Sequence, residues 1–405
     1  MRHSLLYTIV LMLVLSCKDQ PDLTVLKEGV YRAVLTVQDD EELPFIFKVI
    51  DESHLEIYNA EEVITVDQIT YNNDSVYIQA PVFEGFIGAF INENGDLSGH
   101  FTKESLSRVV PFHANYGNTN RFEADKASAD VSGIWEVVFS EGIEGDEYIA
   151  KGIFQQEGNK VTGTFRTTTG DYRYLEGVMD NQTMRVSAFD GAHAFVFVAK
   201  VTDSTMNGQF YSGNHWKEPF VAKRNPNYEL PSADSLTYLK EGYDTLEFEF
   251  PDAEGNIISL NDPEFEGKVV VVQVMGTWCP NCLDESKYYT KFYKANQDQD
   301  FEIVALAFEY AKTKEKAFQG IERLQKRLNI DYPILLAQYG SSDKGEANEK
   351  LPMLNHVLSY PTSIFIDKQG KVRKIHTGFN GPATGDKYLE FKQEFEGFVA
   401  ELLAE

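Results

Sequence analysis

Two of the three cysteines in this 405-residue sequence, Cys279 and Cys282, are separated by only two residues in the stretch "VVVQVMGTWCPNCLDES". Thiols at this spacing can form a redox-active pair, supply half of a zinc site, or close a structural disulfide. The preceding apolar run "KVVVVQVM" is typical of a buried central strand, and Pro280 suits the first turn of a helix. The pair is therefore predicted at a junction between a strand and a helix.

The start of a helix favours exchange chemistry at such a pair. Its unpaired N–H groups and partial positive charge stabilise a thiolate, which is the form that attacks a disulfide. Cys279 comes first and is expected at the exposed end, where it attacks a partner disulfide. Cys282, about one turn further in, is expected to be more buried and to resolve the mixed disulfide. Trp278 is expected to shield the pair and to offer an apolar contact surface.

The other two kinds of site fit the sequence less well. A zinc site needs further ligands, but there is no second CxxC and the 8 histidines have no ligand spacing. A secreted chain held together by disulfides would carry more cysteines at wider spacing. We therefore predict a redox pair that uses no metal and no cofactor.

The elements around the pair predict a mixed sheet covered by helices. From about residue 244 the sequence alternates strand and helix patterns. In chain order these are the hairpin "LEFEFPDAEGNIISL", the strand "FEIVALAFE", the helix "TKEKAFQGIERLQKRLN", the strands "YPILLA", "TSIFID" and "VRKIHTGF", and a C-terminal helix from about Asp386. Strands that alternate with helices and end in a hairpin indicate an α/β domain.

Residues 24 to 223 alternate apolar and polar residues between Asn, Asp and Gly turns, which predicts an all-β region. A weak internal repeat relates "GVYRAVLTV" from Gly29 to "GIWEVVFS" from Gly133. It also relates "LSGHFTKESLSRVVPFHAN" from Leu97 to "MNGQFYSGNHWKEPFVAKRN" from Met206. The repeat predicts two related β-modules, each a sandwich or a barrel, with one large barrel made from both halves as the alternative.

The N-terminus "MRHSLLYTIVLMLVLSC" is typical of a secretory signal and is short for a transmembrane helix. "VLSC" resembles a bacterial lipobox, which implies cleavage before Cys17 and acylation of that cysteine. An ordinary signal peptide with a free Cys17 is the alternative. We expect a lipid-anchored protein of the bacterial cell envelope that faces the periplasm, with the cell surface as the other location.

These observations divide the chain into six predicted segments. They are a signal peptide (1–16), an anchor and linker (17–23), β-module 1 (24–120), β-module 2 (131–225), a linker (226–243) and an α/β domain (244–405). The formal net charge of -26 repels nucleic acid, which needs a positive patch, so none is expected as a partner. The same charge argues against a polybasic membrane contact and leaves the Cys17 lipid as the expected attachment.

"WCPNC" after an apolar strand, followed later by "SYPTSIFIDKQGKV", resembles the thioredoxin superfamily. It resembles more closely the TlpA/ResA type, the membrane-anchored disulfide oxidoreductases of the bacterial envelope. The resemblance covers about residues 244–405 and implies a thioredoxin-like domain with Cys279 as nucleophile and Cys282 as resolving thiol. It also implies disulfide-containing envelope proteins and an upstream membrane electron donor as partners.

The resemblance implies further contacts around the pair. Pro361 matches a cis-proline that faces the cysteines, and the backbone at Tyr360 matches a segment that pairs with bound polypeptide. Gly378 and Phe379 in "HTGFNG" match the third loop of the site. The predicted substrate-binding residues are Trp278, Pro280, Tyr360, Pro361, Gly378 and Phe379.

Glu285 is the predicted proton carrier. It lies three residues after Cys282, on the same helix face, and matches the helix glutamate of the TlpA/ResA type. Gln273 cannot ionise, although cytosolic thioredoxins carry a buried aspartate at that position. A half-buried carboxylate at Glu285 can take and return the proton of the resolving thiol, and a solvated glutamate beside Asp284 is the alternative.

The sequence thus predicts a lipid-anchored thiol–disulfide oxidoreductase that reduces disulfides of other exported proteins. A thiol peroxidase is an alternative enzyme, although Gly276 stands where peroxiredoxin sites need Thr or Ser. The other alternative is a binding or scaffold lipoprotein with an accessory redox domain. An apolar groove of the β-region that faces Cys279 would indicate that the β-modules present the substrate.

Overall fold

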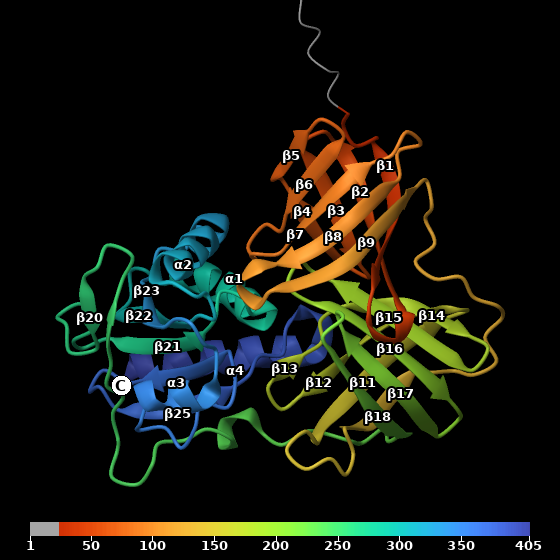
Figure 1. The fold of residues 1–405 in the computed structure, drawn as a ribbon. Helices are drawn as coiled ribbons and strands as arrows, with labels where there is room; N and C mark the ends of the chain where they lie inside the picture. The colour runs from red at the N-terminus through yellow and green to blue at the C-terminus, as the bar shows by residue number, and fades with distance from the viewer. Residues whose placement is uncertain (1–23) are drawn as a thin grey trace, which may run out of the picture.

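The structure is a computed structural model that describes residues 24–405. The predicted signal peptide, the segment 17–23 and the predicted lipidation site Cys17 lie outside the described residues. Two β-sheet bodies from the N-terminal half of the chain pack beside an α/β domain (Figure 1). Among residues 24–405, no helix is both long and apolar enough to cross a lipid bilayer.

The first body is an antiparallel sheet that bends round into a barrel. Its strands are β1 Gly29–Thr36, β2 Glu42–Asp51, β3 His54–Asn59, β4 Glu62–Val66, β5 Ile69–Asn72, β6 Ser75–Gln79, β7 Phe86–Ile91, β8 Leu97–Lys103 and β9 Arg108–Tyr116. Their order is β4-β3-β2-β1-β9-β8-β7-β6-β5, so the first strand pairs with the last and β4 and β5 form the edges. Alternate side chains such as Tyr31, Ala33 and Leu35 point into the core.

The second body repeats this plan and closes completely. Its strands are β10 Gly133–Phe139, β11 Tyr148–Glu157, β12 Lys160–Thr167, β13 Gly170–Asp171, β14 Leu175–Asp180, β15 Thr183–Phe189, β16 Ala194–Val201, β17 Thr205–Ser212 and β18 Trp216–Arg224. β10 pairs with β18 and β11 pairs with β12, which closes the barrel. The repeat predicted at Gly29 and Gly133 is therefore confirmed. Each of these residues begins the first strand of its own sheet, and in both sheets the first strand pairs with the last. The two sheets are separate, so a single large barrel is wrong.

The two barrels form a tight contact. The ring of Phe189 on β15 stacks on that of Phe45 on β2, with centroids 4.3 Å apart. Arg121, in the segment that joins the barrels, is buried and donates to the backbone carbonyls of Ser187 at 3.2 Å and Pro44 at 3.4 Å. The segment between the two barrels therefore helps to fasten one barrel to the other.

The α/β domain has the predicted order of strands and helices. Its elements are β19 Glu249–Pro251, β20 Ile257–Ser259, β21 Val269–Met275, α1 Pro280–Ala295, β22 Phe301–Phe308, α2 Lys314–Leu328, β23 Ile334–Gln338, α3 Lys344–Lys350, β24 Thr362–Ile366, β25 Val372–Thr377 and α4 Asp386–Ala404. The central sheet has the order β23-β22-β21-β24-β25; β21 is parallel to β22 and antiparallel to β24. The short helix α3 is an addition that the sequence patterns did not predict.

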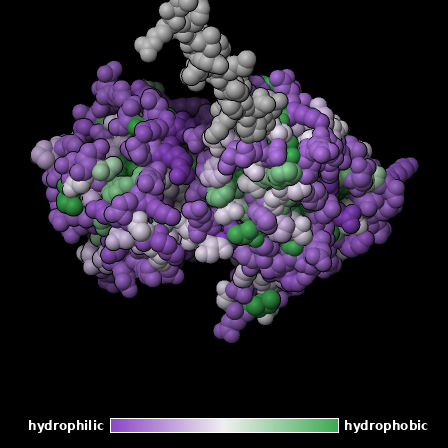
Figure 2. Space-filling view, turned by 45° about the horizontal axis from the view of Figure 1, so that its top comes forward, coloured by the Kyte–Doolittle hydropathy of each residue, from purple (hydrophilic) through white to green (hydrophobic). Residues whose placement is uncertain are grey.

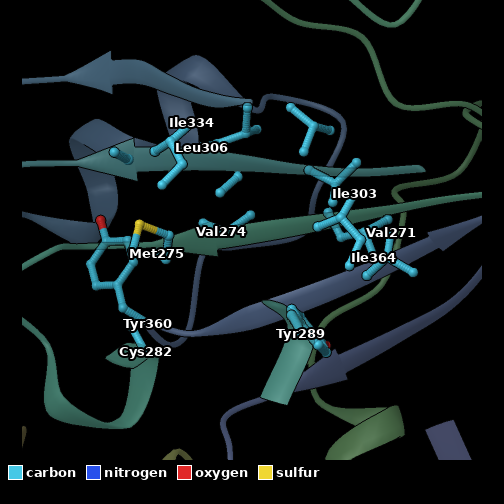
Figure 3. Packing of buried hydrophobic residues seen from close by; sticks show 14 of the residues in the cluster. Val271, Val274, Met275, Cys282, Tyr289, Ile303, Leu306, Ile334, Tyr360 and Ile364 are labelled. Atoms are coloured by element: carbon cyan, nitrogen blue, oxygen red, sulfur yellow. The ribbon is translucent and has the colours of Figure 1, made fainter. Parts of the chain in front are cut away.

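The core of this domain surrounds the central strand. Every residue of β21 is buried, as expected for a strand covered on both faces. α1 packs against α4 through Tyr289 and Phe292, whose rings each lie 5.0 Å from that of Phe395. Cys282 and Tyr360 lie at the same end of the sheet as Met275, the last residue of β21 (Figure 3).

The α/β domain is also attached to the first barrel. Val82 and Phe83, between β6 and β7, belong to the same apolar cluster as the central strand β21. On α2, Arg327 pairs with Asp67 at 2.5 Å and Arg323 donates to the carbonyl of Val82 at 3.3 Å. The surface is hydrophilic over most of the face shown in Figure 2, in keeping with the net charge of -26.

Candidate active site

The cysteine pair lies where β21 ends and α1 begins. Cys279 is the N-cap of α1, and the backbone N–H of Cys282 donates to its Sγ at 3.4 Å. Both thiols are free; Cys279 is 8% exposed and Cys282 is 0% exposed. Burial, and then the hydrogen bond with Cys279, raises the pKa of Cys282 well above its usual value. The first thiol is therefore the more accessible one and the second is held protonated.

The loop before β24 lies directly against Cys279. The Tyr360–Pro361 peptide bond is cis, as the resemblance implied. The thiol of Cys279 donates to the carbonyl oxygen of Tyr360 at 3.4 Å. The Trp278 indole donates to the Phe308 carbonyl at 2.9 Å, and its ring lies edge-on to the Tyr360 ring at 5.6 Å. Trp278, Tyr360 and Pro361 are thus gathered around the first cysteine.

Glu285 is fully buried, so the solvated alternative is wrong. Gln273 donates to its Oε2 at 2.7 Å, and the hydroxyls of Ser363 and Tyr289 donate to its Oε1 at 3.0 and 3.3 Å. Burial raises the pKa of Glu285 to about 7, and these three hydrogen bonds act in the opposite direction. The negative charge of Glu285 is also one of the causes that raise the pKa of Cys282.

Residues 167–173 of the second barrel, which we call the barrel hairpin, cover one side of the pair. Asn281 Nδ2, between the cysteines, donates to the hairpin backbone at 3.2 Å. The hydroxyl of Ser359, in the cis-proline loop, donates to the Thr169 carbonyl at 2.9 Å. Gly378 lies so close that a Cβ there would stand 2.6 Å from the Thr169 carbonyl carbon. The protein's own β-region therefore occupies the Gly378 side of the site.

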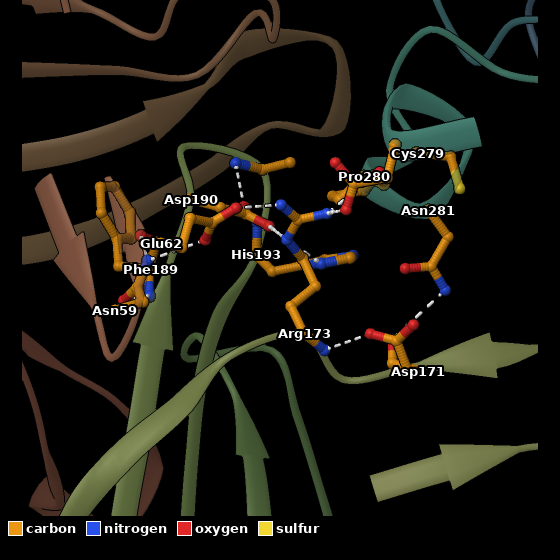
Figure 4. A network of polar contacts seen from close by, with 12 residues as sticks. Asn59, Glu62, Asp171, Arg173, Phe189, Asp190, His193, Cys279, Pro280 and Asn281 are labelled. Atoms are coloured by element: carbon orange, nitrogen blue, oxygen red, sulfur yellow. Dashed lines mark hydrogen bonds and ion pairs between the residues drawn. The ribbon is translucent and has the colours of Figure 1, made fainter. Parts of the chain in front are cut away.

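Arg173 fastens this hairpin to α1 (Figure 4). Its guanidinium is buried and pairs with Asp284 of α1 at 2.5 Å and with Asp190 of the second barrel at 3.3 Å. It also pairs with Glu62 of the first barrel and donates to the carbonyl of Pro280 at 3.2 Å. One side chain thus joins both barrels to the first turn of the active-site helix.

Two of the predicted substrate-binding residues, Phe379 and Pro280, have buried side chains. Phe379 is 0% exposed, and its ring lies 5.0 Å from that of Phe391 on α4. Burial of a large apolar ring stabilises the folded state, so the Phe379 side chain belongs to the core and not to the surface of the site. Pro280 is likewise buried, and its carbonyl is taken up by Arg173.

The sequence patterns missed a second buried acid. Glu309 follows β22 and accepts hydrogen bonds from the backbone N–H and the hydroxyl of Thr277 at 2.7 and 2.8 Å. Burial raises its pKa to about 7. Its place after a buried strand parallel to β21 was a usable signal, because the ends of parallel strands meet at one sheet edge. Within residues 24–405, no group of three or more His, Cys, Asp and Glu side chains could hold a metal ion.

The chain is similar in sequence to known proteins over its α/β domain. The model of the AhpC/TSA family matches residues 242–375. The chain is 31% identical over 156 residues to the thiol-disulfide oxidoreductase ResA of Halalkalibacterium halodurans, over 37% of this chain and 76% of that relative. It is 29% identical over 140 residues to ResA of Bacillus subtilis, over 35% of this chain and 69% of that relative. Among solved structures, the thioredoxin domain of a thiol-disulfide oxidoreductase from Bacteroides vulgatus is 23% identical, with a TM-score of 0.28 over 38% of this chain and 99% of that one.

The mixed sheet, the cysteine pair at a helix start and the cis-proline define a thioredoxin-like disulfide oxidoreductase domain behind a β-rich N-terminal region. Within that class, the chain belongs to the family of the ResA thiol–disulfide oxidoreductases. The barrels lie outside the residues that the family model matches.

Proposed function

We propose that this enzyme reduces disulfides of other exported proteins in the bacterial envelope through Cys279 and Cys282. The observation that carries the proposal is the placement of Cys279: it caps α1, and its thiol lies against the carbonyl of Tyr360 in the cis-proline loop. A substrate sulfur that approaches Cys279 therefore meets a backbone segment that can align it.

In the first step, the Cys279 thiolate attacks one sulfur of the substrate disulfide. An S–S bond forms between Cys279 and that sulfur, and the substrate bond breaks with release of the other sulfur as a thiolate. The positive end of α1 stabilises the attacking thiolate, since Cys279 stands at its N-cap. Trp278 and Tyr360 line the approach with apolar rings.

In the second step, Cys282 attacks the Cys279 sulfur of the mixed disulfide. The Cys279–Cys282 disulfide forms, and the substrate leaves as a dithiol that has gained two electrons and two protons. Cys282 must first lose its proton, which burial makes difficult. Glu285 accepts this proton: a carboxyl group with a pKa of about 7 is a stronger base than an exposed glutamate and can still ionise near neutral pH.

Insulin reduction by the full-length chain in detergent, with a chemical reductant in excess, tests the proposal. Cys279→Ser is expected to abolish turnover. Cys282→Ser that has been reduced, freed of reductant and then mixed with insulin is expected to accumulate a mixed disulfide that mass spectrometry detects. Unchanged turnover in Cys279→Ser would reject Cys279 as the nucleophile. Rapid hydrogen peroxide turnover without insulin reduction would favour a thiol peroxidase instead.

We further propose that acylation of Cys17 anchors the chain and that a membrane electron donor returns the pair to its dithiol form. The lipobox-like "VLSC" supports the anchor, and the two electrons lost in each cycle require a donor. Labelling of expressing bacteria with an alkyne fatty acid should mark the wild-type chain and leave Cys17→Ser unmarked. Label on the Cys17→Ser chain would contradict the anchor.

A further inference from the structure

Both barrels and the α/β domain line an open cavity of about 420 Å³ beside Trp278, the residue before Cys279. The first barrel contributes Lys103 and Arg108, the second contributes Phe195 and Phe210, and the redox domain contributes Trp278 itself. This is within the usual range for a site that takes up a ligand or a few residues of a peptide. Tyr172, near the end of the barrel hairpin, also lines the cavity. The cavity therefore lies beside Trp278, the residue that precedes Cys279, and next to the hairpin that contacts Gly378.

Two cations on the cavity wall have no acidic partner. Within residues 24–405, neither Lys103 nor Arg108 has a carboxylate oxygen within 4.0 Å. Lys103 is 8% exposed, donates to the Ala192 carbonyl at 3.1 Å and lies over the Tyr310 ring at 5.8 Å. Burial, and then the charge of Arg108, lowers the pKa of Lys103 to about 8, so it still carries its charge at neutral pH. A buried lysine and a half-buried arginine that both lack an ion-pair partner, in a chain of net charge -26, indicate a place for an anion.

The acids near the cavity make other contacts. Glu84, whose charge raises the pKa of Lys103, accepts a hydrogen bond from the backbone N–H of Ser105 at 3.4 Å. Glu218 lines the cavity, but its two oxygens accept hydrogen bonds from the hydroxyls of Ser140 at 2.8 Å and Tyr148 at 2.7 Å. Asp190 is held by Arg173 at 3.3 Å. The charge of Asp190 also raises the pKa of Lys103, but none of these carboxylates lies within ion-pair distance of Lys103 or Arg108.

The remaining wall is aromatic. The rings of Phe195 and Phe210 lie 5.2 Å apart, and Tyr172 packs edge-on against both. Trp278 and Tyr310, with ring centroids 5.5 Å apart, continue this surface toward Cys279. A ligand that fills the cavity therefore meets positive charge on one wall and aromatic rings on the others.

We propose that this cavity binds an acidic peptide segment that flanks the disulfide of the substrate protein. A carboxylate of the segment is held by Arg108 and Lys103, and an apolar or aromatic neighbour packs on the ring wall. The proposal rests on the proposed function and adds a preference among its substrates. The acidic surface outside the cavity repels such a segment, so the cavity is the place where the segment binds.

Two synthetic disulfide peptides that differ only in Glu or Gln beside the cysteine test this preference with the full-length chain. We expect kcat/KM to be about tenfold higher for the Glu peptide, since a charge-assisted hydrogen bond is worth roughly one order of magnitude. Arg108→Gln and, separately, Lys103→Met should remove this advantage through KM, with a loss for the Glu peptide that is several-fold larger than any loss for the Gln peptide. Lys223→Gln, exposed on the second barrel, is the control and should change neither.

Equal kcat/KM for both peptides in the wild type would overturn the proposal, as would equal losses for both peptides in Arg108→Gln. Oxidised glutathione reduced as well as the Glu peptide would overturn the peptide part of it. Calorimetric binding of the two peptides to Cys279→Ser separates this inference from the proposed function, because it needs no turnover. Tighter binding of the Glu peptide there supports the cavity even if no disulfide is reduced, and equal binding rejects it.

Discussion

At the scale of single residues, Glu285 and Gln273 form one unit. The side-chain amide of Gln273 donates a hydrogen bond to Glu285 at 2.7 Å. Gln273 therefore orients the buried acid and does not itself ionise. The buried acid of this site lies on α1, one turn after Cys282. Its buried carboxylate makes both the stability and the chemistry of the site depend on pH.

Glu285→Gln should make the protein less sensitive to pH. The pKa of Glu285 rises from 4.5 in the unfolded chain to about 7 in the folded one. Between these values the unfolded state loses a proton that the folded state keeps, so the free energy of unfolding falls as the pH rises from 4.5 to 7. The full loss, on the order of 3 kcal/mol, is present above pH 7. Urea unfolding at pH 5 and pH 8 should show the variant gaining stability relative to wild type at the higher pH.

Glu390→Gln on α4 is the matched control, because that side chain is 56% exposed. Glu309 remains in both proteins, so its own contribution cancels in the comparison. A stability difference between wild type and Glu285→Gln that is the same at both pH values would contradict the buried ionisable carboxyl.

The same substitution should slow the resolving step. Without a carboxylate, the proton of Cys282 has no adjacent acceptor, and loss of a general base costs roughly 100-fold in rate. Rapid-quench analysis should show a longer-lived mixed disulfide on Cys279, with the rate of its formation unchanged. Equal slowing of both steps would indicate a structural effect.

The residues that the sequence predicts well at this site are those set by local spacing. Cys279, Cys282 and Glu285 follow from one helix start and an i, i+3 relation. Phe379 was placed wrongly, because a loop position does not tell whether a side chain faces the core. Arg173 could not be predicted, since its partner Asp284 is 111 residues away and no periodicity connects them.

At the scale of elements, the barrel hairpin and α1 are held together by buried charge. Arg173→Met removes the cation of Glu62 and leaves Asp284 with Lys287 alone and Asp190 with His193 alone, and breaking a buried pair costs ~3–5 kcal/mol. The hairpin should then separate from α1 and expose Cys279. Iodoacetamide labelling of Cys279, followed by mass spectrometry, should be several-fold faster than in wild type.

Arg185→Met serves as the control for this measurement, since Arg185 makes a partly exposed pair with Asp180 in the same barrel. It should leave the labelling rate of Cys279 unchanged. A rate that does not rise in Arg173→Met would show that the hairpin stays in place without the ion network.

A pair of glycines tests the contact of the hairpin with the third loop. Gly378 and Gly370 both have positive φ, at 78° and 81°. A Cβ at Gly378 meets the Thr169 backbone at 2.6 Å, but a Cβ at Gly370 meets nothing within 4 Å. Gly370→Ala should cost ~1 kcal/mol from the left-handed backbone alone, and Gly378→Ala clearly more in urea unfolding. Equal costs would contradict the close packing of the hairpin.

The elements themselves were largely predictable, for physical reasons. Continuous apolar runs such as β21 and strongly amphipathic segments such as α2 carry their own signal. α3 has only seven residues, which is too short for a helical period to show. The internal sequence repeat located the first and last strands of each barrel. The pairing of β11 with β12, which closes the second barrel, could not be predicted, because the alternation of apolar and polar residues does not say which strands pair.

At the scale of the whole molecule, 63 acidic against 37 basic side chains make self-repulsion a general cost to the compact state. Raising the NaCl concentration from about 0.05 M to about 0.5 M screens this repulsion. The Tm at pH 8 should therefore rise. The same increase in salt at pH 4.5, where many carboxylates are protonated, should raise the Tm less. A fall in Tm at pH 8 would show instead that exposed ion pairs contribute more to stability than the repulsion costs.

The barrel hairpin also limits the shape of the proteins that can reach the cysteine pair. We expect that a flat protein surface does not reach Cys279, because the cysteine is 8% exposed and residues 167–173 pack on the neighbouring Ser359 and Gly378. A disulfide must instead arrive on a narrow strand or loop that enters between the hairpin and Trp278. We expect the enzyme to act on disulfides in extended or unfolded segments and to leave those recessed in folded domains intact. The barrels would then do more than hold the redox domain: they would decide the shape of the chain on which it acts.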